Sequence, residues 1–291
     1  MDRKSFIKQS AVMATGLFTL NEFSSLAAGM AGEKKRMPVM FVGHGNPMNA
    51  IEQNEFSQAW KKIGAAIERP KAILCVSAHW MTTGNTLVTA MSKPETIHDF
   101  YGFPDELFAV QYPAPGAVEM AQETIGLVKK TTVQPAHDWG LDHGCWSVLN
   151  PMFPKADIPV FQLSLDLSKP PQWHYELATE LKALRDKGVL IIGSGNIVHN
   201  LGRMQWNNDA FDWAIEFDTW SKERLLAGDH QALVNYKSKG KIADLSIPTN
   251  EHYLPLLYAI ALQDKQDELR FFNEKTMMGS ISMRSVLLGG Y

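Results

Sequence analysis

The segment from Val189 to Asn200, with the sequence VLIIGSGNIVHN, constrains the fold of this chain more than any other. Four apolar residues, three of them β-branched, lead into Gly-Ser-Gly, which is typical of a buried strand that ends in a tight turn. His199 follows that turn. Two further segments repeat the pattern, because VMFVGHGNP places His44 after an apolar run and AILCVSAHW places His79 after another. In open α/β sheets, ligands bind at the carboxyl ends of the strands, so these three histidines are predicted to share one edge.

The other segments alternate between predicted strands and helices. Residues 171–187 combine a proline near the start, an apolar stripe and a glycine stop, which predicts a helix. It connects a predicted strand over 158–165 to the strand that begins at Val189, and such a βαβ unit has parallel strands. Further helices are predicted over 51–66, 115–130, 211–226 and from Tyr253, and further strands over 38–42, 72–77, 86–90, near 133, over 271–272 and over 280–286.

The composition agrees with one folded domain. The chain has 291 residues, of which 45% are hydrophobic and 20% charged, so it can bury a sizeable core. We predict a single-domain α/β fold with a mostly parallel or mixed central sheet flanked by helices. The formal net charge of −3 gives no broad basic field, so neither nucleic acid nor an anionic membrane is predicted as a partner. No oligomeric state is predicted.

The first residues differ from the rest of the chain. A basic opening, an apolar run from Ala11 to Leu20 and small residues near Ala28 are typical of an export signal. The run is short for a membrane span, so no stable membrane insertion of the mature chain is expected. Arg3-Lys4 resembles a twin-arginine signal with lysine in the second place. We predict a signal over residues 1–30, a catalytic domain over 31–291 and export to the periplasm or cell envelope; the alternative is a cytoplasmic protein that keeps an amphipathic amino-terminal helix.

Three polar segments lie between the regular elements. The aromatic stretch from Thr96 to Pro104, TIHDFYGFP, predicts a loop that covers a flat ligand or plugs the core, with His98 in a supporting or lid position. His143 lies between Asp142 and Gly144, where a carboxylate can fix the tautomer of the imidazole. His252 precedes a helix whose positive dipole end disfavours protonation, and a metal ligand must be a neutral imidazole.

Five histidines in glycine-rich or helix-start positions favour a metal site: His44, His79, His143, His199 and His252. Three imidazoles with open positions beside them can hold zinc around a hydrolytic water, or iron around a substrate and oxygen. Other motifs are weak. Gly193-Ser194-Gly195 fails the dinucleotide pattern G-x-G-x-x-G at Val198. Cys145 follows His143 closely enough to be considered as a nucleophile, although a buried structural thiol is the simpler interpretation.

A family resemblance joins these segments. The ordered motifs GHGNPM, SAHW, TIHDFYGFP, DHG, GSGNIVHN and PTNEHYLPLLY resemble those of the class III (LigB-type) extradiol ring-cleavage dioxygenases, and in particular the branch of 4,5-DOPA extradiol dioxygenases. The resemblance covers about residues 37–289. It implies cleavage of a catechol such as DOPA with O₂ to give a ring-opened semialdehyde, with Fe(II) for activity and Zn(II) able to occupy the same site.

The resemblance also implies roles for individual residues. His44, His79 and His252 match the positions that hold the metal. His199 matches the acid–base histidine, which can also lie close enough to join a zinc ion. His143 matches a second catalytic histidine that hydrogen-bonds oxygen or an intermediate.

Two alternatives use the same histidines. One is a zinc-dependent hydrolase, and the other is a non-catalytic metal-binding recognition protein. Metal identity combined with turnover separates the first from a dioxygenase, and binding of a catechol without oxygen uptake would indicate the second.

Overall fold

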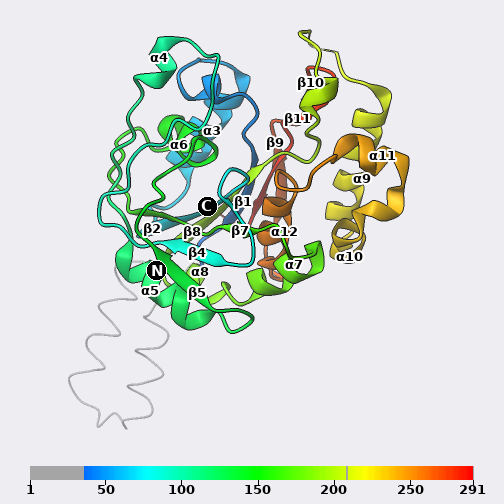
Figure 1. Ribbon diagram of the computed structural model, residues 1–291. Helices are drawn as coiled ribbons and strands as arrows, with labels where there is room; N and C mark the ends of the chain where they lie inside the picture. Colours follow the sequence, from blue (N-terminus) through cyan, green and yellow to red (C-terminus); the bar gives the residue numbers. More distant parts are fainter. Residues whose placement is uncertain (1–35, 208, 291) are drawn as a thin grey trace, which may run out of the picture. The chain divides into compact units, whose positions relative to one another are not determined.

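The computed structural model describes residues 36–207 and 209–290. The predicted export signal over residues 1–30 lies outside these residues. The described chain folds around a six-stranded sheet with the strand order β6-β2-β8-β1-β12-β9 (Figure 1). The strands are β6 (Val160–Gln162), β2 (Ala72–Ser77), β8 (Val189–Gly195), β1 (Val39–Gly43), β12 (Ser285–Leu288) and β9 (Leu269–Phe272).

The sheet is mixed. The first four strands are parallel, whereas β12 runs antiparallel to both β1 and β9. The predicted βαβ unit is present, and β2 lies between its two strands. The carboxyl ends of β1, β2 and β8 therefore meet at one edge, as the sequence pattern predicts.

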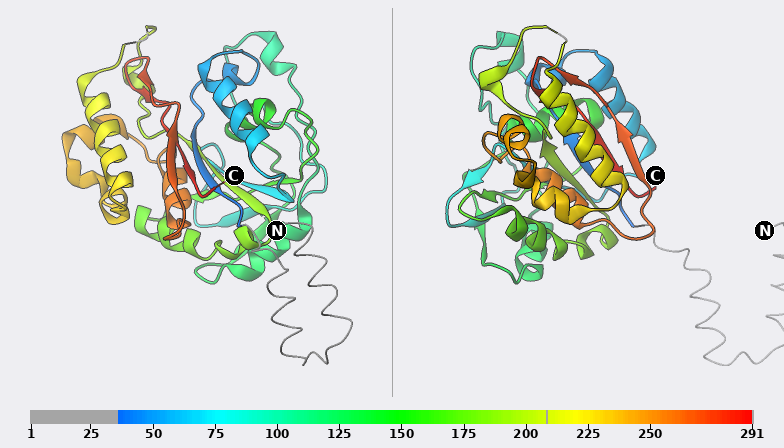
Figure 2. Two further views of the ribbon diagram at one scale, coloured as in Figure 1. Left: turned by 180° about the vertical axis from the view of Figure 1, so that it is seen from behind. Right: turned by 90° about the vertical axis from the view of Figure 1, so that its right-hand side faces the viewer.

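Helices cover both faces of the sheet (Figure 2). Along β1, Val39 and Phe41 belong to one apolar core and Met40 and Val42 to the other, because side chains alternate along a strand. The core with Met40 is closed by α3 (Glu55–Ala66) and α6 (His143–Met152). The core with Val39 is closed by α7 (Pro171–Thr179) and α12 (Leu254–Ala261), and farther from the sheet by α9 (Asp212–Leu226).

Short elements fill the connections. The helices are η1 (Pro47–Ala50), α4 (Asp105–Phe108), α5 (Val118–Leu127), α8 (Ala183–Asp186), η2 (Leu201–Arg203), α10 (His230–Val234), η3 (Tyr236–Lys239) and α11 (Lys241–Ser246). Three strand pairs lie outside the main sheet: β3 (Met81–Thr82) with β7 (Leu165–Asp166), β4 (Thr86–Thr89) with β5 (Val133–Ala136), and β10 (Thr276–Met277) with β11 (Ile281–Ser282).

The predicted single-domain α/β fold with a mixed sheet is confirmed, with local differences. The helix predicted over 171–187 is divided into α7 and α8. Helix α6 was not predicted, because nearly all of its side chains are buried and it therefore has no polar face to produce a helical period. Within the described residues, no helix combines the length and the apolar character needed to cross a bilayer.

Candidate active site and metal centre

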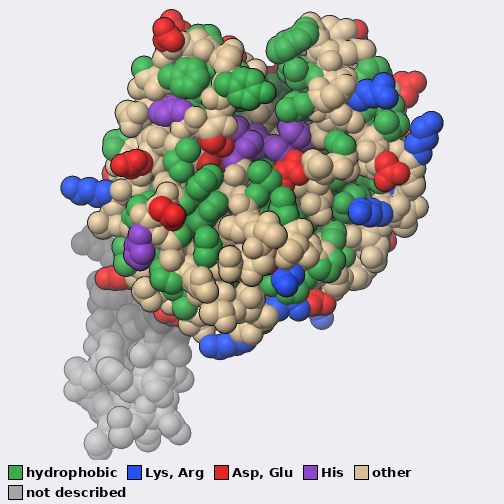
Figure 3. All heavy atoms as spheres, in the orientation of Figure 1, with side chains coloured by type: hydrophobic (Ala, Val, Ile, Leu, Met, Phe, Trp, Pro, Cys, Tyr) green, Lys and Arg blue, Asp and Glu red, His purple; other side chains and the backbone are tan. Residues whose placement is uncertain are grey.

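Five histidines line one cavity of about 710 Å³ at the carboxyl edge of the sheet. His44, His79 and His199 follow β1, β2 and β8, His143 is the first residue of α6, and His252 lies in the turn before α12. In the space-filling view, histidine side chains form the floor of a hollow whose rim carries hydrophobic side chains (Figure 3). This arrangement agrees with the sequence prediction that His44, His79 and His199 share one edge.

His252 reaches this edge because strand β8 ends in glycines. A Cβ atom on Gly195 would lie 2.1 Å from the carbonyl oxygen of His252, and one on Gly193 would lie 2.2 Å from that of Pro255. Any side chain at either position would therefore push the turn away. The backbone N–H of Asn196 donates to the His252 carbonyl at 2.8 Å and fixes this approach. The Gly-Ser-Gly segment thus serves backbone packing, in agreement with its failure to match a dinucleotide fingerprint.

Ser194 determines the tautomer of His44. Its hydroxyl donates to the carbonyl of Gly144 at 2.5 Å, and a carbonyl can only accept. The hydroxyl has no second proton, so its 3.0 Å contact with His44 Nδ1 requires that Nδ1 carry the hydrogen. The Nε2 lone pair of His44 is then directed away from Ser194 and is free for a ligand.

Carboxylates contact Nδ1 of three other imidazoles. Asp99 Oδ2 lies 3.4 Å from His79 Nδ1 and 2.9 Å from His143 Nδ1, and Asp99 Oδ1 accepts from the His143 backbone at 2.8 Å. Glu251 Oε1 lies 3.1 Å from His252 Nδ1. Carboxylates in this position orient a metal-ligating histidine and raise its basicity, leaving Nε2 as the donor atom.

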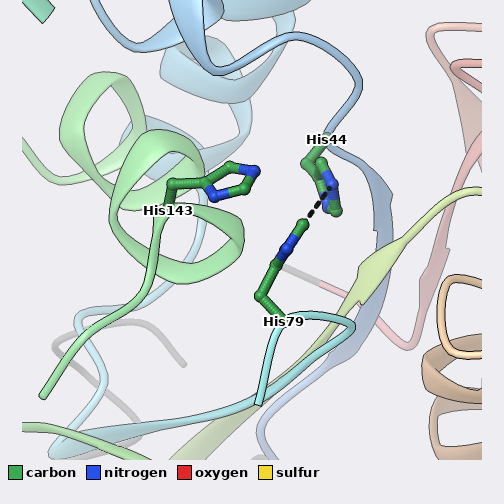
Figure 4. Close-up of side chains that lie close together, drawn as sticks. All are labelled: His44, His79 and His143. Carbon is green, nitrogen blue, oxygen red and sulfur yellow. Dashed lines mark hydrogen bonds between the residues drawn. The ribbon is translucent and has the colours of Figure 1, made fainter. Parts of the chain in front are cut away.

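The spacing of three rings fits a single metal ion. The Nε2 atoms of His44 and His79 are 3.2 Å apart (Figure 4), and two nitrogens bound to one zinc-like ion at about 2.0–2.1 Å lie roughly 2.8–3.4 Å apart. The ring centroids of His44, His79 and His252 are 5.1, 5.3 and 5.0 Å apart in pairs. An equilateral arrangement of this size suits three imidazoles on one face of a metal.

The other two imidazoles are arranged differently. His199 stacks on His252 with a centroid distance of 3.5 Å and an interplanar angle of 9°, so their lone pairs lie in two separate, nearly parallel planes and do not converge on one point. The ring centroids of His143 and His79 are 3.8 Å apart. Ligand atoms of His44, His79 and His143 nevertheless lie within 4.8 Å of one another, as do those of His199, Glu251 and His252. Both histidines therefore border the position that a metal would take.

Burial keeps His44, His79, His199 and His252 neutral. Removal from water, together with the neighbouring histidines, lowers the pKa of His79 to about 3 and that of His199 to about 4. The same causes lower the pKa of His44 and of His252 well below the ordinary value. For Asp99, burial opposes ionisation, but the contacts with His143 and His79 outweigh it and lower the pKa. Neutral imidazoles backed by an ionised carboxylate are suited to bind a divalent cation.

Some residues considered from the sequence have other positions. His98 Nε2 contacts the carbonyl of Val110, and its ring packs against Phe100 and Trp146, so it supports the aromatic loop rather than lining the cavity. Cys145 is buried, and burial raises the pKa of its thiol well above the ordinary value, which disfavours a nucleophile.

The carboxylate beside His143 is Asp99 and not its neighbour Asp142. The Asp142 carboxylate instead accepts from Ser77 Oγ and Gln162 Nε2 at 2.6 Å each. Sequence reasoning missed Asp99 and Ser194 as site residues. Asp99 lies in a loop without regular period, and its only signal was its place beside His98 in the motif TIHDFYGFP.

Comparison with known proteins identifies the family. Residues 37–282 match the family model described as the catalytic LigB subunit of aromatic ring-opening dioxygenase. The chain belongs to the LigB family. This LigB enzyme is therefore a ring-cleaving dioxygenase of the extradiol class, and members of the family depend on a metal, for which the histidine cluster is the candidate site.

Relatives agree over most of their length. The LigB chain is 46% identical over 260 residues to a protein of Escherichia coli (strain K12) named 4,5-DOPA dioxygenase extradiol, covering 87% of this chain and 95% of that protein. A protein of the same name from Mirabilis jalapa is 36% identical, with coverage of 80% and 89%. A crystal structure of an uncharacterized protein from Escherichia coli K12 superposes with a TM-score of 0.76 at 42% identity, covering 87% of this chain and all of that one.

The tautomer argument for Ser194 predicts the effect of removing its hydroxyl. Ser194→Ala is expected to lower metal affinity roughly 10- to 100-fold, as loss of such an outer partner does elsewhere, because His44 is no longer held with Nε2 free. Metal affinity would be measured by competition with a chromogenic chelator. Ser147→Ala is the control, since this buried serine of α6 has no hydrogen-bond partner for its hydroxyl. Equal affinities of the two variants would contradict the role assigned to Ser194.

Proposed function

We propose that this LigB enzyme cleaves a catechol such as DOPA next to its diol with O₂, using non-haem Fe(II) held by His44, His79 and His252. The ring-opened product is a semialdehyde. The observation that carries the proposal is the triangle of these three rings, each with an Nδ1 partner and with Nε2 free. Relatives named 4,5-DOPA dioxygenase extradiol support the catechol class of substrate.

Fe(II) in this position would bind both catechol oxygens and O₂ and so bring the two reactants together. Zn(II) is expected to fit the same ligands, but it has no redox chemistry and would give an inactive enzyme.

His199 is proposed as the acid–base residue. Its neutral ring can accept the proton of a catechol hydroxyl at a ring nitrogen and return it to the opened product. Stacking on His252 supports this role over the alternative of a further zinc ligand, because the two parallel rings do not converge on one point.

His143 is proposed to form a hydrogen bond with oxygen or with a reaction intermediate in the cavity that it lines. Asp99 contacts its Nδ1 and its backbone N–H, so the orientation of the ring is fixed by a residue that also contacts His79. One carboxylate thus links a proposed metal ligand to a proposed catalytic group. The aromatic loop with Phe100 and Phe103 lines the same cavity and would shield it from bulk water.

Substitution of single histidines separates these roles. His79→Ala is expected to lose bound metal and turnover together, whereas His199→Gln is expected to retain metal and lose most turnover, by roughly 10²- to 10⁴-fold for a general base. Metal content would be measured by elemental analysis and turnover by oxygen uptake. The exposed His137 provides a control, since His137→Ala should change neither quantity. Full metal content in His79→Ala would refute the ligand assignment.

We also propose that the chain is exported, on the basis of the amino-terminal sequence alone. Expression of the full chain should give a shortened protein in the periplasmic fraction, detected by fractionation and mass spectrometry. Replacing Arg3 and Lys4 with glutamine should retain it in the cytoplasm. A full-length protein found only in the cytoplasm would refute export.

A further inference from the structure

We infer that the cavity selects catechols whose ring substituent is uncharged and apolar and discriminates against substituents that carry a carboxylate. The inference deepens the proposed function and rests on it. It concerns the part of the substrate that lies beyond the diol. The DOPA side chain, which carries both a carboxylate and an ammonium group, is then tolerated rather than recognised.

The side chains that line the cavity offer no positive charge to a carboxylate. Of the 18 described residues that line the cavity, none is lysine or arginine. Among these described residues, Asp99 is the one acidic residue. A carboxylate on the ring substituent would lose hydration in this cavity and would find no cationic side chain in the lining.

The mouth of the cavity is lined by apolar side chains. With the diol at the histidine floor, a ring substituent points toward the mouth of the cavity. Two segments form that region: the loop with Phe100 and Phe103, and the segment after β8 with Leu201, Met204 and Trp206. These side chains are apolar, so an alkyl or aryl substituent would be removed from water on both sides.

Two aromatic side chains that line the cavity are largely exposed to solvent. Tyr101 is 92% exposed and Trp206 is 85% exposed, and among the described residues they are the two most exposed large hydrophobic side chains. Both line the same cavity. Exposed aromatic side chains at a cleft are typical of a surface that a ligand covers, and an apolar substituent would cover these two.

Arg203 is the cationic residue that lies nearest in sequence to a residue of the cavity lining. It lies in η2 between the lining residues Leu201 and Met204, but it is exposed and does not itself line the cavity. It is therefore not expected to pair with a carboxylate of the substrate, and this expectation can be tested by substitution.

Three catechols of nearly equal size provide the test: 4-propylcatechol, 3-(3,4-dihydroxyphenyl)propanoate and dopamine, whose side chains end in methyl, carboxylate and ammonium. On the Fe(II)-loaded enzyme, kcat/KM for 4-propylcatechol should exceed that for the propanoate by about tenfold or more, since the carboxylate remains unpaired. From 4-methyl- to 4-propylcatechol, each methylene should raise kcat/KM roughly fourfold. DOPA should fall below 4-propylcatechol as well.

Substitutions of the residues at the cavity mouth test whether they cause the preference for an apolar substituent. Met204→Arg introduces a cation and should reduce the preference for propyl over propanoate by about tenfold. Met204→Leu, which conserves volume, should keep the preference, and so should Arg203→Ala. Trp206→Ala should reduce the increase in kcat/KM that each added methylene of the substituent gives.

The outcomes separate this inference from the proposed function. Equal or better use of the propanoate or DOPA, or a loss of carboxylate substrates in Arg203→Ala, would overturn the inference while the enzyme remains a catechol dioxygenase. If no catechol is cleaved, the proposed function fails. The selectivity of the cavity can still be tested by titration calorimetry, which measures how tightly the Zn(II)-loaded protein binds each catechol. Tighter binding of 4-propylcatechol than of the propanoate would support the inference there, and the reverse order would overturn it.

Discussion

The site depends on how closely the turn before α12 approaches the end of strand β8. Gly193 and Gly195 leave room for the carbonyl groups of Pro255 and His252, and the N–H of Asn196 holds that turn in place. This contact brings a histidine from the carboxyl-terminal part of the chain to the edge where β1 and β2 deliver His44 and His79. Without it, His252 would not reach His44 and His79.

A second set of contacts turns this cluster of histidines into an ordered one. Ser194, Asp99 and Glu251 each contact an Nδ1 atom, so the Nε2 atoms are left to face the cavity. Ser194 also connects His44 to the first turn of α6, which begins at His143. Because the partners are a hydroxyl and two carboxylates, the protein supplies negative charge behind the imidazoles and the low polarity of burial around them, which together favour a bound cation.

Much of this arrangement could be predicted from the sequence. His44, His79 and His199 each follow an apolar run, and the rule that parallel strands end at one edge places them together. Asp99 could not be placed, because an irregular loop carries it and only tertiary packing brings it to His79 and His143. Ser194 resembles an ordinary turn residue between glycines, because the Gly144 carbonyl that its hydroxyl contacts comes from a distant part of the chain. Helix α6 lacked a polar face, so its period gave no signal.

The measurement that tests the central claim most directly is oxygen uptake by the protein after removal of metal and anaerobic reloading with either Fe(II) or Zn(II). DOPA and simple catechols would be offered in turn. We expect uptake stoichiometric with catechol for the Fe(II) protein, with a yellow ring-opened product, and no uptake for the Zn(II) protein. Absence of uptake with every catechol at full iron loading would contradict the assignment of this site to Fe(II)-dependent extradiol cleavage.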